Sequence, residues 1–177
     1  MIDVRMAHTA SLSAGELADI RALLDDAFDG GFSDDDFEHA LGGIHALARE
    51  GHDLVAHGSV VMRRLLHEGR ALRTGYVEAV AVRADRRGLG LAGLVMVELE
   101  RVIRGGYELG ALSASTMAQP FYRARGWQPW TGTASVLAPS GIQRLPGEED
   151  SVYLLPVTVT PAPGGDLACD WGAGDPW

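Results

Sequence analysis

The pattern of hydrophobic and polar positions in the first forty residues predicts an extended start followed by two helices. Residues 2–8 read as a short strand. Ser13 and Glu16 form a capping box, which predicts a helix to about Phe28. Its inner face is expected to be formed by Leu17, Ile20, Leu24 and Phe28. Ser33 precedes three aspartates that suit the first turn of a second, short helix.

The next segment predicts an antiparallel meander. Strands are expected at residues 44–49, 54–66 and 71–82. The sequences Gly51-His52-Asp53 and Glu68-Gly69 are typical of the turns that separate such strands. These three strands are therefore expected to form one continuous part of a sheet.

An amphipathic helix opens the second half of the chain. From Arg87 the pattern predicts a helix to about Ile103, and Gly105-Gly106 is expected to end it. The residues expected to form its buried stripe are Leu91, Leu94, Val95, Leu99 and Val102. A further strand is expected at residues 107–114.

The remaining elements are shorter. Ser115 predicts the cap of a short helix that stops at Gly126. Strands are expected at 127–137 and 151–159, and the Pro- and Gly-rich tail 160–177 is expected to pack on the surface. This order predicts an α/β (α+β) fold with a mixed, largely antiparallel central sheet flanked by helices.

Length and charge narrow the class of protein. The 177 residues suit a single domain over residues 1–177. The formal charge of −9 disfavours binding to nucleic acid, which needs a basic surface. It favours a cationic partner, but for net charge taken alone solubility is the preferred explanation.

The cysteine and histidine content and the absence of a long apolar run predict a cytoplasmic protein without a metal site. Cys169 is the only cysteine, so no intrachain disulfide can form. No signal segment and no membrane-spanning apolar run is recognised, so neither export nor membrane association is expected. The six histidines lack metal-ligand spacing, and we therefore expect no metal site.

The most informative stretch joins the third meander strand to the glycine-rich start of the long helix. A helix N-terminus presents unpaired N–H groups to an anion, and Gly88 and Gly90 let a phosphate approach the backbone. Arg86 and Arg87 add charge and phosphate-binding guanidinium groups. The stretch therefore predicts a pyrophosphate site, whereas the alternative is a tight turn with close helix–strand packing.

These residues resemble a known family. Residues Arg87-Gly88-Leu89-Gly90-Leu91-Ala92 match the Arg/Gln-x-x-Gly-x-Gly/Ala signature of the GCN5-related N-acetyltransferases. The chain also resembles one branch, the aminoglycoside 2′-N-acetyltransferases, over nearly its whole length. The similar stretches are 38–43, 72–78, 104–113 and 169–171.

The resemblance implies an acetyltransferase of the same fold. It would transfer the acetyl group of acetyl-CoA to the 2′-amine of an aminoglycoside antibiotic, and it would act as a homodimer. The residues implied to bind acetyl-CoA are Val80, Ala81, Val82, Arg87, Gly88, Leu89, Gly90, Leu91 and Ala92. The alternatives are transfer to another amine, of a polyamine, a cell-wall aminosugar or a protein, and a non-catalytic acyl-CoA-binding domain.

Two residues are candidates for proton transfer. Glu78 lies in an apolar strand, where a carboxylate needs either an ion-pair partner such as Arg73 or a role as general base. A bulge near Glu78 would aim it into the site. The resemblance implies that Glu78 is the base and that Tyr122 is the general acid, although a tyrosine beside Phe121 can also be a core residue.

The resemblance also implies the contacts with a polycationic aminosugar. They fall on Glu78, Ala79, Ser113, Glu148, Asp175 and Trp177. Trp177 would offer an indole face and a terminal carboxylate. Three positions depart from the family pattern: Gly31 replaces an acidic residue for which Asp29 or Asp34 can substitute, Ala79 replaces glycine, and Glu148 replaces aspartate.

Overall fold

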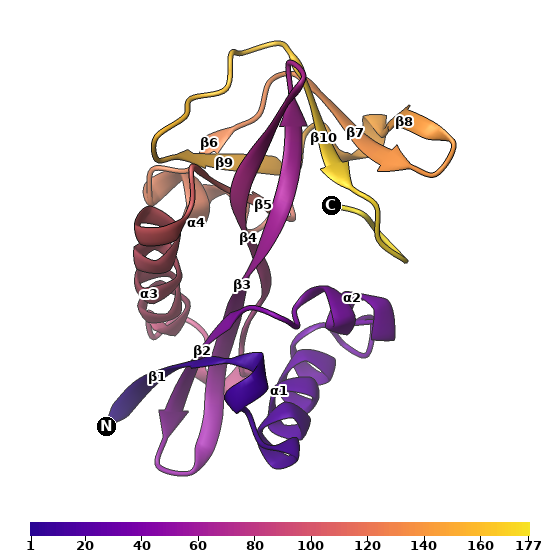
Figure 1. Cartoon of the computed structure of the whole chain (residues 1–177). Coiled ribbons are helices and arrows are strands. Elements are labelled where there is room, and N and C mark those ends of the chain that lie inside the picture. The colour runs from indigo at the N-terminus through magenta and orange to yellow at the C-terminus, as the bar shows by residue number, and fades with distance from the viewer. The chain divides into compact units, whose positions relative to one another are not determined.

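The computed structural model describes all residues, 1–177, as two compact units (Figure 1). The first unit consists of Met1–Val61 and Val77–Val102, and the second consists of Met62–Tyr76 and Ile103–Trp177. Two long strands and one helix contribute residues to both units.

The first unit contains the N-terminal elements and the glycine-rich loop. They are β1 (Ile2–His8), η1 (Thr9–Ser11), α1 (Ala14–Ala27), α2 (Asp34–His39), β2 (Ile44–Glu50), the start of β3 (Asp53–His67), the end of β4 (Arg70–Val82), η2 (Ala84–Arg86) and most of α3 (Leu91–Gly106). Strand β2 pairs antiparallel with both β1 and β3, and its register shifts between Ala48 and Arg49. Strand β3 is hydrogen-bonded in turn to β4, so the meander predicted from the sequence is confirmed.

Local capping explains the two N-terminal helices, as predicted. The Ser13 side chain accepts from the Glu16 backbone N–H, and the Glu16 carboxylate accepts from the Ser13 backbone N–H. Ser33 and Asp36 form the same reciprocal box for α2. The prediction that Phe28 lies on the inner face of α1 was wrong, because Phe28 is the C-terminal cap of the helix and is 45% exposed.

A small hydrophobic core underlies α1. Its buried residues are Ala7, Ile20, Leu23, Leu24, Leu47, Leu54 and Ala81. Helix α3 buries Leu91, Val95 and Leu99 as predicted, but Leu94 is 45% exposed and Met96 is buried in its place. The helix also continues through Gly105 and Gly106, beyond its predicted end.

The second unit contains the remaining strands and α4. The elements are the end of β3, the start of β4, β5 (Leu109–Ser113), α4 (Gln119–Ala124), β6 (Gln128–Pro129), β7 (Thr133–Ala138), β8 (Gly141–Arg144), η3 (Pro146–Glu148), β9 (Val152–Pro156) and β10 (Asp166–Asp170). Their order across the sheet is β6-β9-β5-β4-β3-β10-β7-β8. The β4–β5 and β10–β7 pairs are parallel, and the other registered pairs are antiparallel. The prediction of a mixed, largely antiparallel sheet is confirmed.

Several details of this unit differ from the sequence prediction. Ser115 does not cap α4 with its side chain, because the N-cap is Ala118 and Ser115 contributes only its carbonyl. The strand expected at 127–137 is divided into β6 and β7, and β8 was not predicted. The tail 160–177 contributes β10 to the sheet, with Leu167, Ala168 and Cys169 fully or almost fully buried.

Candidate active site

Strand β4 ends in the first unit at the segment expected to hold the cofactor. Ala81 is buried, and Val80 and Val82 are half-buried. The next backbone N–H, that of Arg83, donates to the Val55 carbonyl at 2.9 Å, which fixes the end of β4 against β3. The chain then turns through η2 into the glycine-rich loop.

The two arginines of that loop differ in their contacts. The Arg86 guanidinium is paired with Glu50 at 2.9 Å and with Asp85 at 2.8 Å. Arg87 is exposed, and its guanidinium donates to the carbonyls of Val82 and Ala27 rather than to a carboxylate. Of the two side chains, Arg87 is therefore the one whose charge is available to an anion.

The loop geometry requires glycine at two positions. Gly88 has φ +79° and Gly90 has φ +80°, a region that L side chains rarely adopt. A Cβ built at either position meets nothing within 4 Å, so the space beside the backbone is open. Leu89 is 66% exposed between them, whereas Leu91 is buried at the first turn of α3. This cradle, with Ala92 in the same first turn, fits the phosphates of a coenzyme.

Glu78 and Ala79 lie just before this segment, where β4 departs from regular strand geometry. Ala79 has φ +54°, and Glu78 is half-buried. The Ala79 carbonyl accepts a hydrogen bond from the His57 ring nitrogen Nδ1 at 2.9 Å. Left-handed backbone at a non-glycine residue is costly, and within a strand it persists only where the surrounding structure enforces it. The position where the family pattern has glycine thus adopts a conformation that suits glycine.

The alternative partner for Glu78, Arg73, has other contacts. Its Nε donates to the Gly106 carbonyl at 3.0 Å, and its backbone N–H donates to the Glu108 carboxylate at 2.9 Å. Four strand residues lie between Arg73 and Glu78, and the five steps along the strand span about 16 Å. An Arg73–Glu78 ion pair is therefore not the reason for a carboxylate at position 78.

Three expected substrate residues occur together in the second unit. Ser113 Oγ, at the end of β5, donates to Ser151 Oγ at 3.0 Å, and Ser151 Oγ lies 3.0 Å from Glu148 Oε2. Burial raises the pKa of the Glu148 carboxyl, and the negative charge of Asp175 raises it further. A cation placed near these two carboxylates would relieve their repulsion.

Tyr122 lies on α4 in the same unit. Its side chain is 7% exposed and packs edge-on against Phe121 and Trp127, with ring centroids 5.1 Å and 6.2 Å away. Burial raises the pKa of the phenol to about 12. The hydroxyl therefore carries its proton at neutral pH, as a general acid must.

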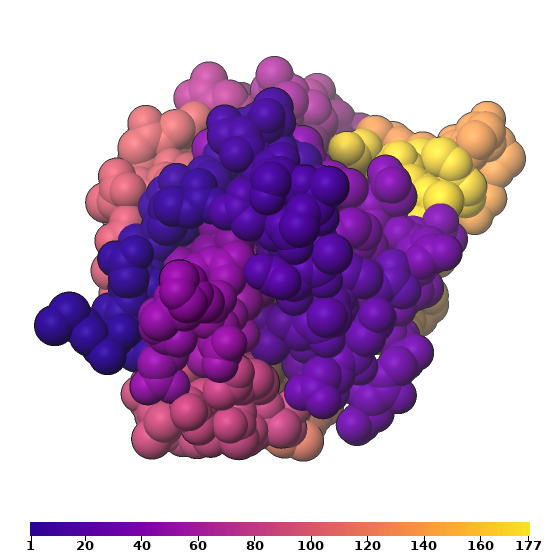
Figure 2. All heavy atoms as spheres, turned by 90° about the horizontal axis from the view of Figure 1, so that it is seen from below, coloured from indigo at the N-terminus to yellow at the C-terminus, as the bar shows by residue number.

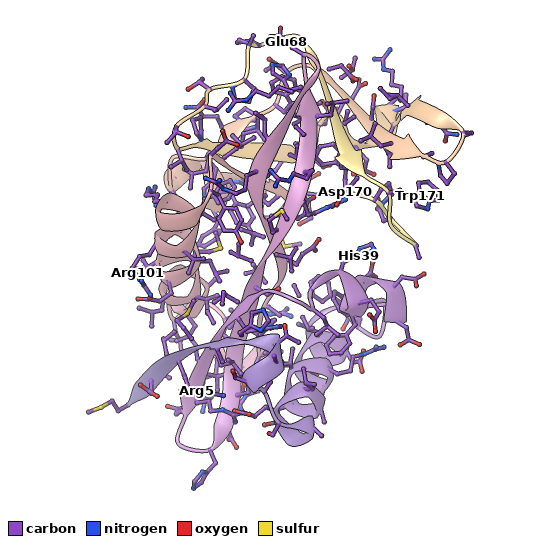
Figure 3. All side chains as sticks on the ribbon, in the orientation of Figure 1. Arg5, His39, Glu68, Arg101, Asp170 and Trp171 are labelled. Atoms are coloured by element: carbon purple, nitrogen blue, oxygen red, sulfur yellow. The ribbon has the colours of Figure 1, made fainter.

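Trp177 is buried rather than presented as an open aromatic face. It is 8% exposed, and its indole Nε1–H donates to the Ser135 carbonyl at 3.1 Å. Its backbone N–H donates to the Asp175 carboxylate at 3.3 Å. By contrast Trp171, which follows Asp170 at the end of β10 (Figure 3), is 56% exposed.

Comparisons with known proteins show the family of this chain. Residues 8–130 match the family model described as acetyltransferase (GNAT) domain. The chain belongs to the GNAT acetyltransferase family. It is 48% identical, over 98% of its length and 91% of the relative's, to an aminoglycoside 2′-N-acetyltransferase of Mycolicibacterium fortuitum.

Solved structures confirm the GNAT fold. A GNAT family N-acetyltransferase of Escherichia coli, YhbS, solved in complex with CoA, has a TM-score of 0.68 and 17% identity, covering 96% of this chain and 89% of that one. A GNAT family acetyltransferase of Brucella melitensis in complex with acetyl-CoA has a TM-score of 0.64 and 19% identity, covering 98% and 97%. The expected family and fold are thus confirmed.

Two aspartates, one in α1 and one in α2, form ion pairs with the same arginine of the protein. Arg21 of α1 pairs with Asp25 at 2.8 Å and with Asp34 at 2.7 Å. Helices α1 and α2 lie on the face turned toward the viewer in Figure 2. Asp34 is thus held by Arg21, whereas Asp29 is exposed and has φ +52°.

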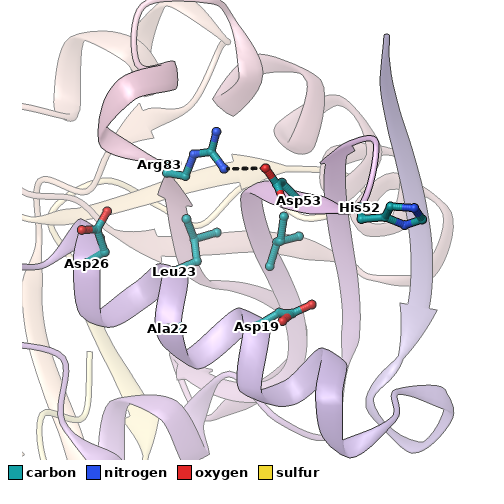
Figure 4. A pocket seen from close by; sticks show the side chains of 8 residues that line it. Asp19, Ala22, Leu23, Asp26, His52, Asp53 and Arg83 are labelled. Carbon is teal, nitrogen blue, oxygen red and sulfur yellow. Dashed lines mark hydrogen bonds and ion pairs between the residues drawn. The ribbon is translucent and has the colours of Figure 1, made fainter.

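A cavity in the first unit lies apart from the predicted residues. It has a volume of about 420 Å³ and is lined by Asp19, Ala22, Leu23, Asp26, His52, Asp53, Leu54 and Arg83 (Figure 4). Arg83 reaches Asp53 at 3.4 Å and Asp85 at 2.7 Å. We assign this cavity no role in the acetyltransferase.

Sequence reasoning missed two residues that contact the predicted site residues. Ser151 links Ser113 to Glu148, and His57 binds the Ala79 carbonyl. A lone serine in an acidic loop gives no sequence signal. A histidine among apolar strand residues, such as His57, did offer one, because a buried histidine needs hydrogen-bond partners.

No three or more His, Cys, Asp or Glu side chains are grouped so that they could hold a metal ion. No helix is both long and apolar enough to cross a membrane.

Proposed function

We propose that this chain acetylates the 2′-amine of aminoglycosides with acetyl-CoA as donor. The observation that supports the substrate is the 48% identity to an aminoglycoside 2′-N-acetyltransferase over 98% of the chain. The pairing of Glu148 with Ser151 and Ser113, near the charge of Asp175, provides carboxylates suited to a polycationic sugar. Glu78, Ala79 and the terminal carboxylate of Trp177, whose indole ring is buried, complete the proposed substrate contacts.

The residues from Val80 to Ala92 are proposed to hold the donor. Main-chain groups of Val80, Ala81 and Val82 would bind the pantetheine amides and the thioester carbonyl. The open backbone at Gly88 and Gly90, the N-terminus of α3 and the Arg87 guanidinium would bind the pyrophosphate. Leu89, Leu91 and Ala92 complete this cradle.

The proposed reaction is a direct attack in a ternary complex. The neutral amine nitrogen forms a bond to the thioester carbonyl carbon, and the carbon–sulfur bond then breaks. Glu78 takes the amine proton through water, and the Tyr122 hydroxyl gives its proton to the leaving thiolate. The products are the 2′-N-acetyl sugar and free CoA, and the antibiotic would thereby be inactivated.

A comparison of two kanamycins tests the site of transfer. CoA release is measured with a kanamycin that carries a 2′-amine and with one that carries a 2′-hydroxyl. We expect release with the first alone. Equal release with both would exclude 2′ specificity, and release only with polyamines, cell-wall aminosugars or protein amines would assign another acceptor.

Glu78→Gln tests the base. We expect kcat to fall by about 10²-fold or more near neutral pH, because the amide cannot accept the amine proton. Acetyl-CoA affinity, measured by calorimetry, should stay within about twofold, since the proposed cradle is unchanged. An unaltered kcat would remove Glu78 from the mechanism.

The cellular setting belongs to the same proposal. We propose a cytoplasmic homodimer that binds neither nucleic acid nor membrane, which agrees with the net charge of −9 and with the resemblance to its family. Light scattering coupled to gel filtration measures the mass directly. A single species near 18.8 kDa would contradict the dimer.

A further inference from the structure

A chain of hydrogen bonds crosses the interior of the first unit and ends at Ala79. Thr9 Oγ1 lies 2.7 Å from His45 Nε2, and His45 Nδ1 lies 2.9 Å from His57 Nε2. His57 Nδ1 lies 2.9 Å from the Ala79 carbonyl oxygen. Both imidazoles are 0% exposed. At the outer end, the backbone N–H of exposed Gly42 donates to Thr9 Oγ1 at 2.9 Å.

The acceptor at the inner end fixes the direction of every bond. A carbonyl oxygen can only accept, so His57 carries its proton on Nδ1 and accepts at Nε2 when neutral. His45 must then donate from Nδ1 and accept at Nε2, which takes the hydrogen of the Thr9 hydroxyl. We call this set, Thr9, His45 and His57, the histidine relay.

The histidine relay stays uncharged at neutral pH. Burial lowers the pKa of His57 to about 3, and the neighbouring His45 contributes. Burial also lowers the pKa of His45 to about 4, and His8 contributes there. Because the relay ends on a carbonyl, it has no group to which a proton could be passed. Its geometry suits holding the backbone rather than moving protons.

What the relay holds is the irregular turn that follows Glu78. Ala79 has φ +54°, and the Glu78 carbonyl lies 3.5 Å from Ser59 Oγ. Side chains of β3 therefore reach the carbonyls of both Glu78 and Ala79. A strained backbone persists only where its surroundings determine it more strongly than its own preference.

We propose that Thr9, His45 and His57 are positioning residues that fix the Ala79 peptide and thereby orient the Glu78 carboxylate for the acetyl transfer. This inference rests on the proposed function, in which Glu78 is the base. A small displacement of a catalytic group lowers the rate steeply, so the relay acts on kcat more than on cofactor affinity.

The test compares two variants of one residue. His57→Leu removes the donor to Ala79, whereas His57→Asn keeps an amide N–H near the position of Nδ1. We expect His57→Leu to lower kcat by about tenfold or more, with the acetyl-CoA dissociation constant within about twofold, and His57→Asn to restore most of kcat. Wild-type kcat in the leucine variant would overturn the proposal.

His67 provides a matched control in the second unit. It is 7% exposed, and its Nδ1 lies 2.9 Å from the Asp166 carbonyl oxygen. His67→Leu therefore removes the same kind of bond elsewhere and should lower stability while leaving kcat unchanged. If it lowered kcat as much as His57→Leu, general destabilisation would be the cause and the positioning role would be wrong.

Two measurements keep the proposal testable if His57→Leu does not fold. Thr9→Val removes the hydroxyl at the outer end and should lower kcat, whereas Thr9→Ser should not. Long-range proton–nitrogen NMR spectra of wild-type protein should show His45 and His57 as Nδ1–H tautomers between about pH 5.5 and 8. Nε2–H or charged rings would overturn the relay.

These readouts separate the inference from the proposed function. The NMR measurement needs no acceptor at all. Absence of transfer to any 2′-amine would contradict the proposed function alone, because the variants are then compared on whichever polyamine, cell-wall aminosugar or protein amine accepts the acetyl group. Equal kcat for wild type, His57→Leu and Thr9→Val on that amine would contradict the positioning role.

Discussion

The buried histidine pair predicts a loss of stability at mildly acidic pH, and His57 supplies the sharpest test. In the unfolded chain a histidine titrates near its ordinary pKa of 6.5, whereas burial lowers the pKa of folded His57 to about 3. Between these values the unfolded state binds a proton that the native state does not. The contribution of neutral His57 to the free energy of unfolding is therefore fully present above pH 6.5 and is lost as the pH falls toward the pKa of the folded state.

The size of the loss follows from the two pKa values. Between pH 7 and pH 5 the unfolded histidine becomes almost fully charged while folded His57 stays neutral, which removes about 2 kcal/mol from the free energy of unfolding. His45, with a pKa lowered to about 4, contributes a similar amount. The pair together removes about 4 kcal/mol, a large fraction of the stability of a typical domain.

Urea unfolding of wild type and His57→Asn at pH 7 and pH 5 measures this contribution. Asparagine keeps a donor for the Ala79 carbonyl and does not titrate. The variant should therefore lose about 2 kcal/mol less than wild type between the two pH values. His52→Asn, in the exposed β2–β3 turn, is the control and should behave as wild type. Equal losses in wild type and His57→Asn would refute the assignment of a neutral buried imidazole.

Three further predictions test the proposed acid and the backbone. Tyr122→Phe should lower kcat by about tenfold or more. Because the phenol pKa is about 12, wild-type kcat should show no decline from ionisation of Tyr122 up to about pH 10. Equal rates and pH profiles for the two proteins would remove Tyr122 as the acid. Ala79→Gly should leave the free energy of unfolding in urea unchanged or raise it by up to about 1 kcal/mol, because φ +54° suits glycine. A clear loss of stability in this variant would contradict the left-handed conformation. Gly43→Ala should lower the free energy of unfolding in urea by more than about 2 kcal/mol, because the new Cβ would lie 2.0 Å from the Val60 carbonyl oxygen. The control is Gly105→Ala in α3, whose Cβ meets nothing within 4 Å and which should be neutral or stabilising in the same urea assay.

Sequence alone was sufficient where a structure depends on residues close together in the chain. The Ser13–Glu16 and Ser33–Asp36 boxes fix two helix starts within four residues each. The glycines at 88 and 90, which are left-handed in the structure, lie in the short loop that joins a strand to the next helix, and both elements could be predicted locally. The family could also be inferred from sequence, because its signature lies in this one continuous stretch.

Only the tertiary structure decided features that depend on distant partners. Strand β10 pairs with β3 through Ala168 and Leu66, about a hundred residues apart, and no local pattern in a Pro- and Gly-rich tail specifies that pairing. The contact of Ser151 with Ser113 depends likewise on the β5–β9 register.

The same distinction applies to the histidines and to Ala79. The sequence shows that His45 and His57 lie in apolar strands, but not that their rings meet or that they reach a carbonyl on β4. A left-handed alanine is unfavourable by its own preference, so no local rule predicts it. It exists because side chains from a neighbouring strand bind the carbonyls that it reorients. Local preferences therefore decided where helices and turns begin, whereas hydrogen bonds between strands decided which polar groups meet.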